Sequence, residues 1–256
     1  MKRTCLFTIV LLAAMLISNT LQAKGLKVLY IGDSITDGNW GGGGGRSSSE
    51  RSLWDMNNIY GHGFMFICAS HYMSRYPECE YNFYNRGISG NSLYDLEKRW
   101  EEDVIEIHPD VLSILIGIND AGNYLRSDKK TPFDFKAWDL KYRELLDRAM
   151  KANPNLKLVI ASPFVAPTGK MGENGEFGDY NRIVEQCISI VKKIADDYKA
   201  IYLPYQQMFD QILKESPTSQ NTYWIWDGVH PTAAGHQRMA DMWIQAADKV
   251  NLLSTK

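Results

Sequence analysis

Four short segments of this sequence carry the side chains that nucleophilic acyl transfer requires. They supply a serine, a histidine, an aspartate, a side-chain amide and a glycine whose backbone amide can approach a ligand closely. A serine hydroxyl becomes a nucleophile when a base takes its proton, and a histidine oriented by a carboxylate is such a base. The segments are Gly-Asp-Ser-Ile-Thr at 32–36, Asn-Arg-Gly-Ile-Ser-Gly at 85–90, Gly-Ile-Asn-Asp at 117–120 and Asp-Gly-Val-His-Pro at 227–231.

Ser34 is the candidate nucleophile. It follows an apolar run that is typical of a strand, so we expect it at the carboxyl edge of a sheet. A helical turn that begins there would point backbone N–H groups at a developing oxyanion. The alternative is that Ser34 only caps a helix. Because the sequence contains no Gly-x-Ser-x-Gly, it does not favour the nucleophile elbow of the α/β-hydrolases.

His230 is the candidate base, and Asp227 precedes it by three residues. Across one tight turn, that spacing lets the carboxylate reach Nδ1–H of the imidazole, fix its tautomer and stabilise the imidazolium. Pro231 then suits the start of a helix. A metal site of Asp227, His230 and His236 is the alternative, but it lacks a recognisable ligand spacing. We expect His236 instead to pack or hydrogen-bond within the last helix.

Gly90 and Asn119 are the candidate oxyanion donors beside the backbone amide of Ser34. Each follows a predicted strand, so both can converge on the edge that carries Ser34. A glycine lets its N–H approach a substrate oxygen, and an asparagine amide adds a second donor. Taken singly, Gly90 could be a turn glycine and Asn119 a helix cap.

The elements that must position these residues alternate regularly between strand and helix. Strand-like runs occupy 26–31, 81–84, 111–116, 156–161 and 201–203. Helical patterns occupy 63–75, 93–107, 134–152, 180–198 and 231–250. The strands lack polar alternation, as expected when helices cover both faces of a sheet. The pattern predicts one α/β domain, a parallel sheet in a three-layer sandwich.

Two glycine-rich stretches interrupt this alternation. Residues 41–49 hold five glycines and three serines, and residues 164–178 hold four glycines and one proline beyond a strand. We predict both to be loops at the carboxyl edge, where ligands bind in open α/β sheets. A phosphate-binding role for residues 41–45 is disfavoured because no Gly-Lys-Ser/Thr follows.

The N-terminus has the pattern of a secretory signal peptide. Lys2 and Arg3 precede an apolar stretch at 6–17, and Ala23 offers a cleavage point. We therefore expect residues 1–23 to be removed, leaving a domain of residues 24–256 in the periplasm or outside the cell. An uncleaved anchor is the alternative. After cleavage, no stable membrane insertion is expected.

Charge and cysteine content limit the partners further. The net charge is −2, and the mildly acidic surface offers no footprint for nucleic acid. Three cysteines lie beyond the leader, and export would permit one disulfide, for which Cys68 and Cys79 are closest in sequence. Cys187 falls in the apolar rhythm of a helix and is expected to be unpaired. The oligomeric state is left open, a homo-oligomer included.

The four segments, in this order, resemble those of the SGNH hydrolases, a branch of the GDSL esterases and lipases. The matching residues are Ser34, Gly90, Asn119 and His230, with Asp227 as the acid. The resemblance implies a flavodoxin-like five-stranded sheet, serine esterase chemistry, and no metal or other cofactor. The sequence departs from the family pattern at the glycine-rich insertion after residue 39.

Longer runs are similar to SGNH-type bacterial acetylxylan esterases, among them Asn-Arg-Gly-Ile-Ser-Gly-Asn at 85–91 and Trp-Asp-Gly-Val-His-Pro at 226–231. By this resemblance Trp226 would line the acyl pocket, and Asp33 is assigned with it to substrate binding. The prediction is an esterase that removes acetyl groups from an acetylated oligo- or polysaccharide such as xylan. Its alternatives are a lysophospholipase or thioesterase, and an inactive glycan-binding module. Five aromatic residues suit stacking on sugars but could equally serve the core: Trp40, Trp54, Tyr60, Trp224 and Trp226.

Overall fold

A computed structural model describes residues 25–38, 59–216, 218 and 220–253. The expected signal peptide and the glycine-rich segment 41–49 lie outside these residues, as do Trp40 and Trp54. None of the helices in the described ranges is long and apolar enough to cross a membrane.

Five parallel strands form one sheet in the order β2-β1-β3-β4-β5. All five match the predicted strand runs, with ends that shift by up to three residues. This order is that of flavodoxin-like sheets, as the resemblance implied. The strands are β1 (Lys27–Gly32), β2 (Asn82–Gly87), β3 (Val111–Leu115), β4 (Lys157–Ala161) and β5 (Ile201–Leu203).

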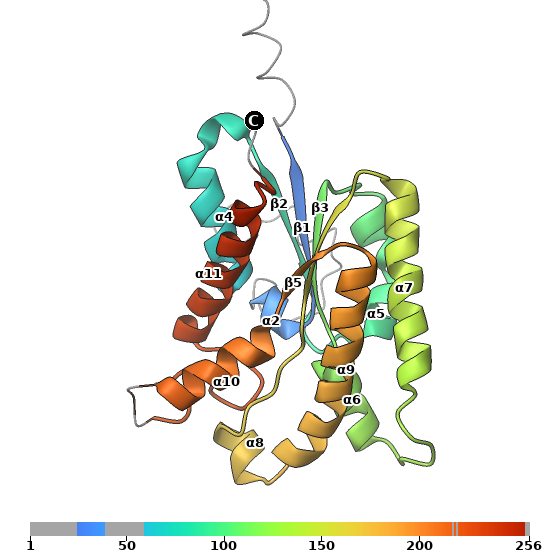
Figure 1. Ribbon diagram of the computed structural model, residues 1–256, viewed down its shortest axis with the longest axis vertical. Helices are drawn as coiled ribbons and strands as arrows, with labels where there is room; N and C mark the ends of the chain where they lie inside the picture. The colour runs from blue at the N-terminus through green and yellow to red at the C-terminus, as the bar shows by residue number, and fades with distance from the viewer. Residues whose placement is uncertain (1–24, 39–58, 217, 219, 254–256) are drawn as a thin grey trace, which may run out of the picture.

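Helices cover both faces of the sheet, which confirms the predicted three layers (Figure 1). One outer layer holds α4 (Phe64–Arg75) and α11 (Ala233–Lys249), and the other holds α5 (Leu93–Lys98), α7 (Phe135–Ala152) and α9 (Phe177–Asp197). The burial of every residue of β3 explains why its sequence lacks polar alternation. Around the carboxyl ends of the strands lie α2 (Ser34–Asp37), α6 (Ile118–Arg126), α8 (Gly169–Glu173) and α10 (Tyr205–Glu215).

Two predicted segments differ in detail. The helical pattern at 93–107 is divided into α5 and a π-helical turn, η2 (Glu101–Ile105). A charged residue in that turn, Asp103, is fully buried beside Val104. The stretch 164–178, predicted as a loop, contains α8 and the start of α9. A short 3-10 turn, η1 (Pro77–Cys79), precedes β2.

The cysteines of the described ranges are all free and buried. Cys68 and Cys79 do not form the disulfide that export would permit. Cys187 lies on the buried face of α9, as its place in the apolar rhythm predicted.

A glycine at the end of β2 brings the first two segments together. The backbone of α2 passes so close to Gly87 that a Cβ there would lie 2.2 Å from the backbone nitrogen of Asp37. Real Cβ atoms do not approach backbone so closely, so only glycine fits without a shift. Ser34, at the start of α2, is thereby placed beside the turn that follows β2.

We predict that Gly87→Ala lowers the free energy of unfolding by on the order of 3 kcal/mol, because the methyl group must displace backbone. Gly178→Ala is the matched control, since a Cβ at that exposed position in α9 would meet no atom within 4 Å. Chemical denaturation of both variants measures the difference. Equal stability of Gly87→Ala and the parent protein would contradict the close packing.

Candidate active site

Ser34 stands where β1 gives way to α2, at the carboxyl edge of the sheet. Its Oγ lies 2.8 Å from Nε2 of His230, which comes from a turn 196 residues later in the chain. The structure therefore joins the predicted nucleophile and the predicted base in one hydrogen bond. Within this bond the imidazole can accept the hydroxyl proton.

Asp227 lies on the other side of the imidazole from Ser34. Its Oδ2 lies 2.7 Å from His230 Nδ1, and its Oδ1 accepts the backbone N–H groups of Val229 at 3.0 Å and His230 at 2.7 Å. The hydrogen bond that Asp227 accepts from the imidazole raises the pKa of His230, although burial lowers it. Burial raises the pKa of Asp227, but its hydrogen bonds with His230 outweigh that effect and lower it. The carboxylate of Asp227 can therefore stabilise the imidazolium that forms when His230 takes up a proton.

The turn that carries this pair is held by the stretch after β4. The backbone N–H of Ala166 donates to the oxygen of Gly228 at 2.8 Å, and that of Met171 donates to the oxygen of Asp227 at 3.2 Å. Gly228 has a φ of +95°, which glycine adopts without strain. The second predicted loop therefore acts on the site by supporting the Asp227–His230 turn.

Gly90 and Asn119 lie on the turns after β2 and β3. Gly90 is exposed with a φ of +82°. Asn119 is in the first turn of α6, and its Nδ2 donates to the backbone oxygen of Asn91 at 3.1 Å. That bond uses one of the two amide hydrogens and ties the third segment to the second. The second amide hydrogen of Asn119 can donate a hydrogen bond to a ligand.

Trp226 lies against the ring of His230. Its ring is stacked on the imidazole with centroids 6.0 Å apart and is 52% exposed. Trp224 is placed differently, because its Nε1 donates to Ser216 Oγ at 2.9 Å and the guanidinium of Arg238 lies over its ring. Of these two tryptophans, Trp226 is the one whose ring lies against His230.

The side chain of Asp33, which was assigned with Trp226 to substrate binding, is buried at 1% exposure. Its Oδ1 accepts the backbone N–H of Ile35 at 3.0 Å and so caps α2, while its Oδ2 has no hydrogen-bond partner among the described residues. Burial raises the pKa of this carboxyl to about 7. The position of Asp33 in the motif is therefore explained by helix capping.

His236 accepts a hydrogen bond from a second helix. Its Nδ1 accepts the backbone N–H of Phe64 at 3.2 Å, at the start of α4, so its bond reaches another helix and not the last helix as predicted. Burial lowers the pKa of His236 to about 4. Within the described ranges, no three His, Cys, Asp or Glu side chains are grouped as metal ligands would be.

One residue that sequence reasoning missed, Arg99, connects segments of the site. Arg99 donates to Asn91 Oδ1 at 2.9 Å and to the backbone oxygen of Gly32 at 3.2 Å. In the sequence, Arg99 stands beside an apolar helical stripe, where a charged residue usually faces solvent. No local signal distinguishes it from its neighbours Lys98 and Glu97.

With this geometry the chain belongs to the GDSL-like lipase/acylhydrolase family, whose sequence profile matches residues 30–238. The fold and the relatives define it as a carboxylic ester hydrolase of the SGNH type. It is 33% identical over 220 residues to the acetylxylan esterase of Geobacillus stearothermophilus, covering 85% of this chain and 91% of that enzyme.

Solved structures show the same likeness. A structure from Parabacteroides merdae described as a GDSL-like lipase has a TM-score of 0.75 at 31% identity, covering 90% of this chain and 99% of that one. The acetylxylan esterase Axe2 of Geobacillus stearothermophilus has a TM-score of 0.69 at 31% identity, covering 88% of this chain and 94% of that one.

The buried carboxyl of Asp33 leads to a prediction on stability. Its pKa rises from 3.8 to about 7 on folding, so the parent protein loses stability as pH increases through this window, by up to about 4 kcal/mol. Asp33→Asn keeps the cap but cannot ionise. Its stability relative to the parent should therefore increase between pH 4 and pH 8, as measured by denaturation across that range.

Asp134→Asn is the control, because Asp134 caps α7 in the same way but is exposed. Its effect on stability should be small at every pH. A constant offset between Asp33→Asn and the parent protein across the pH range would show that Asp33 ionises normally.

Proposed function

We propose that this protein removes O-acetyl groups from carbohydrate, with Ser34 as nucleophile, His230 as general base and acid, and Asp227 as the residue that orients and stabilises His230. The observation that carries the mechanism is the unbroken row from Ser34 Oγ to His230 Nε2 at 2.8 Å and from His230 Nδ1 to Asp227 Oδ2 at 2.7 Å. The relatives add support, since solved catalytic mutants of Axe2 replace a serine and an aspartate.

In the first half of the reaction, Ser34 Oγ attacks the acetyl carbonyl carbon while His230 Nε2 takes its proton. The carbonyl oxygen becomes an oxyanion on a tetrahedral intermediate. When the intermediate collapses, the bond to the sugar oxygen breaks, and the proton on Nε2 passes to that oxygen. The products are the free hydroxyl of the sugar and an acetyl ester on Ser34.

In the second half, water attacks the acetyl carbon of the acyl-enzyme while His230 Nε2 again takes a proton. Collapse of the second tetrahedral intermediate returns that proton to Ser34 Oγ and releases acetate. Asp227 remains ionised throughout and stabilises the imidazolium, which agrees with its lowered pKa.

Three donors would hold the oxyanion: the backbone N–H groups of Ser34 and Gly90 and the Nδ2 hydrogen of Asn119 that Asn91 leaves unused. The bond from Asn119 to Asn91, directly after Gly90, supports a common position for the last two. Removal of one such donor typically lowers turnover by about 10²–10³-fold.

The substrate class rests on the relatives and on Trp226. The Geobacillus relative is an acetylxylan esterase, and a tryptophan directly before its catalytic aspartate has been replaced in another solved mutant. In this chain, Trp226 precedes Asp227 and offers an exposed aromatic face beside His230. An exposed ring of this kind suits the apolar face of a sugar or an acetyl methyl group.

We further propose that residues 1–23 direct export, so that the enzyme acts on polymers in the periplasm or outside the cell. The proposal rests on the basic start, the apolar stretch at 6–17 and Ala23.

Acetyl esters should be hydrolysed with a higher kcat/KM than octanoyl esters of the same alcohol, and acetylated xylo-oligosaccharides should release acetate. A 4-nitrophenyl ester series and an acetate assay measure both. Ser34→Ala is the control and should abolish both activities. Preference for octanoyl esters would assign the protein to lipid hydrolysis, and activity in Ser34→Ala would contradict the mechanism.

Asp227→Asn should lower kcat by roughly 10⁴-fold, because the amide can hold the wrong imidazole tautomer. The bond and charge of Asp227 raise the pKa of His230, and catalysis needs neutral His230. Residual kcat/KM should therefore reach its plateau at lower pH in the variant than in the parent. A pH profile of kcat/KM for both proteins tests this. If the low-pH limb of the profile does not shift and kcat stays near that of the parent, another group orients His230.

A further inference from the structure

Arg99 joins the segments that would form the oxyanion hole. Its Nε donates to Asn91 Oδ1 at 2.9 Å, its Nη1 to the backbone oxygen of Arg86 at 2.8 Å and its Nη2 to the backbone oxygen of Gly32 at 3.2 Å. Gly32 lies two residues before Ser34, and Arg86 and Asn91 stand on either side of Gly90. One guanidinium thus fixes the end of β1 to both sides of the turn after β2.

The turn around Gly90 has little packing of its own. Ser89 and Gly90 are exposed, and a Cβ at Gly90 would meet no atom within 4 Å. Its position therefore depends on hydrogen bonds to its neighbours. Asn91 is held on three sides, because its N–H donates to Ile88 at 3.1 Å, its backbone oxygen accepts from Asn119 at 3.1 Å and its Oδ1 accepts from Arg99.

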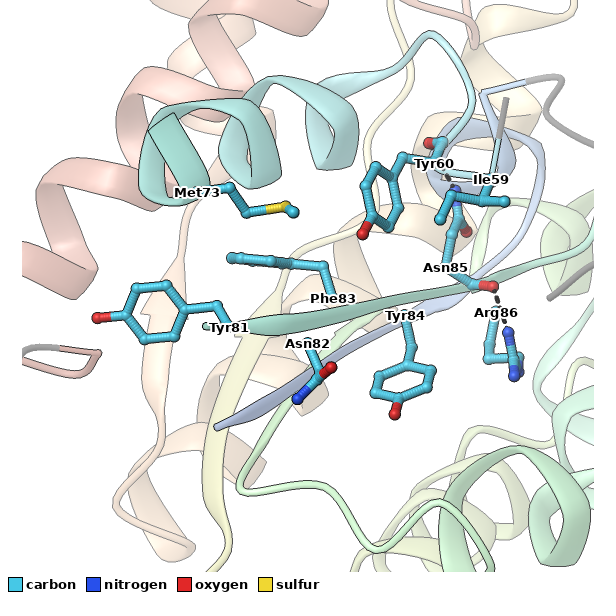
Figure 2. A pocket seen from close by; sticks show the side chains of 9 residues that line it. All are labelled: Ile59, Tyr60, Met73, Tyr81, Asn82, Phe83, Tyr84, Asn85 and Arg86. Atoms are coloured by element: carbon cyan, nitrogen blue, oxygen red, sulfur yellow. Dashed lines mark hydrogen bonds between the residues drawn. The ribbon is translucent and has the colours of Figure 1, made fainter. Parts of the chain in front are cut away.

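The charge of Arg99 is balanced below the turn. Its side chain is 13% exposed and forms an ion pair with Asp103, which is fully buried. The same carboxylate lies 3.2 Å from Nε of Arg86. Arg86 extends from the face of β2 opposite α4 and donates to the backbone oxygen of Asn85 at 3.0 Å (Figure 2). The ion pair with Asp103 therefore holds Arg99 while its guanidinium donates to the other segments.

We propose that Arg99 is a positioning residue of the oxyanion hole. By holding Gly32 and Asn91 at fixed separation, it sets the distances between the backbone donors of Ser34 and Gly90 and, through Asn91, the amide of Asn119. This inference rests on the proposed function. Because the oxyanion exists only after attack, the effect of Arg99 falls on kcat and leaves KM nearly unchanged.

Arg99→Lys tests the proposal, because lysine keeps the charge beside Asp103 but lacks the planar fork that reaches three acceptors. We expect kcat for acetyl ester hydrolysis to fall by about 10–10³-fold with little change in KM. Arg143→Lys is the matched control: Arg143 is 21% exposed and pairs with Asp139 and Asp197, away from the site. The control should retain the parental kcat and KM.

Asn91→Ala separates positioning from folding. It removes the acceptor of Arg99 Nε and leaves every charge in place, so it should lower kcat in protein whose melting curve shows that it is folded at the assay temperature. Arg99→Lys combined with Asn91→Ala should be scarcely slower than the slower single variant, because Asn91 is one of the acceptors through which Arg99 acts. A kcat of Asn91→Ala equal to that of the parent protein would overturn the proposal. So would a decrease in the kcat of Arg99→Lys that is fully explained by its fraction of unfolded protein.

Failure of the proposed function would be recognised separately. The rate at which a fluorophosphonate modifies Ser34 also depends on oxyanion donors, and it can be measured without any acetyl ester. If the parent protein reacts at Ser34 but does not release acetate, the substrate proposal fails while slower modification of Arg99→Lys still supports positioning. If the parent and Arg99→Lys are modified equally fast, the positioning role is wrong.

Discussion

The carboxylate of Asp227 uses its two oxygens for different tasks. Oδ1 accepts two backbone N–H groups of its own turn, which fixes the carboxylate in the plane that the turn defines. Oδ2 faces Nδ1 of His230, so the fixed carboxylate in turn fixes the imidazole. Because Nδ1 of His230 faces Asp227, Nε2 is the ring nitrogen that faces Ser34 Oγ. The conformation of this one turn therefore positions the proposed base beside the hydroxyl. The contacts of Ala166 and Met171 with this turn extend its support to the stretch after β4.

The other half of the site depends on how closely the ends of β1 and β2 approach. Parallel strands deliver their following segments to one edge of the sheet, but further contacts are needed to hold those segments together. The absence of a side chain at Gly87 lets α2 lie directly on β2. Arg99 then bonds the end of β1 to β2 and to the turn after it. The carboxylate of Asp103 balances the charges of Arg99 and Arg86. The proposed nucleophile, whose base comes from a distant segment, thus also depends on how the segments after two neighbouring strands are held together.

Much of this could be predicted from the sequence. The strands and the alternation of elements follow from apolar periodicity, and the spacing of Asp227 and His230 predicted their hydrogen bond because both lie in one turn. Residues whose partners are distant in sequence could not be assigned in the same way. His236 bonds to the start of α4, and Arg99 bonds to three other segments. Asp33 appeared available to substrate because burial by later segments has no local signal.

The central claim is that acetyl transfer passes through Ser34. Rapid quenching of the enzyme during turnover of an activated acetyl ester, followed by proteolysis and mass spectrometry, tests it most directly. We expect an acetyl group on the peptide that contains Ser34, appearing with the initial burst of alcohol and disappearing as substrate is exhausted. Acetate release without any acetylated peptide, or with the acetyl group on a different residue, would contradict it.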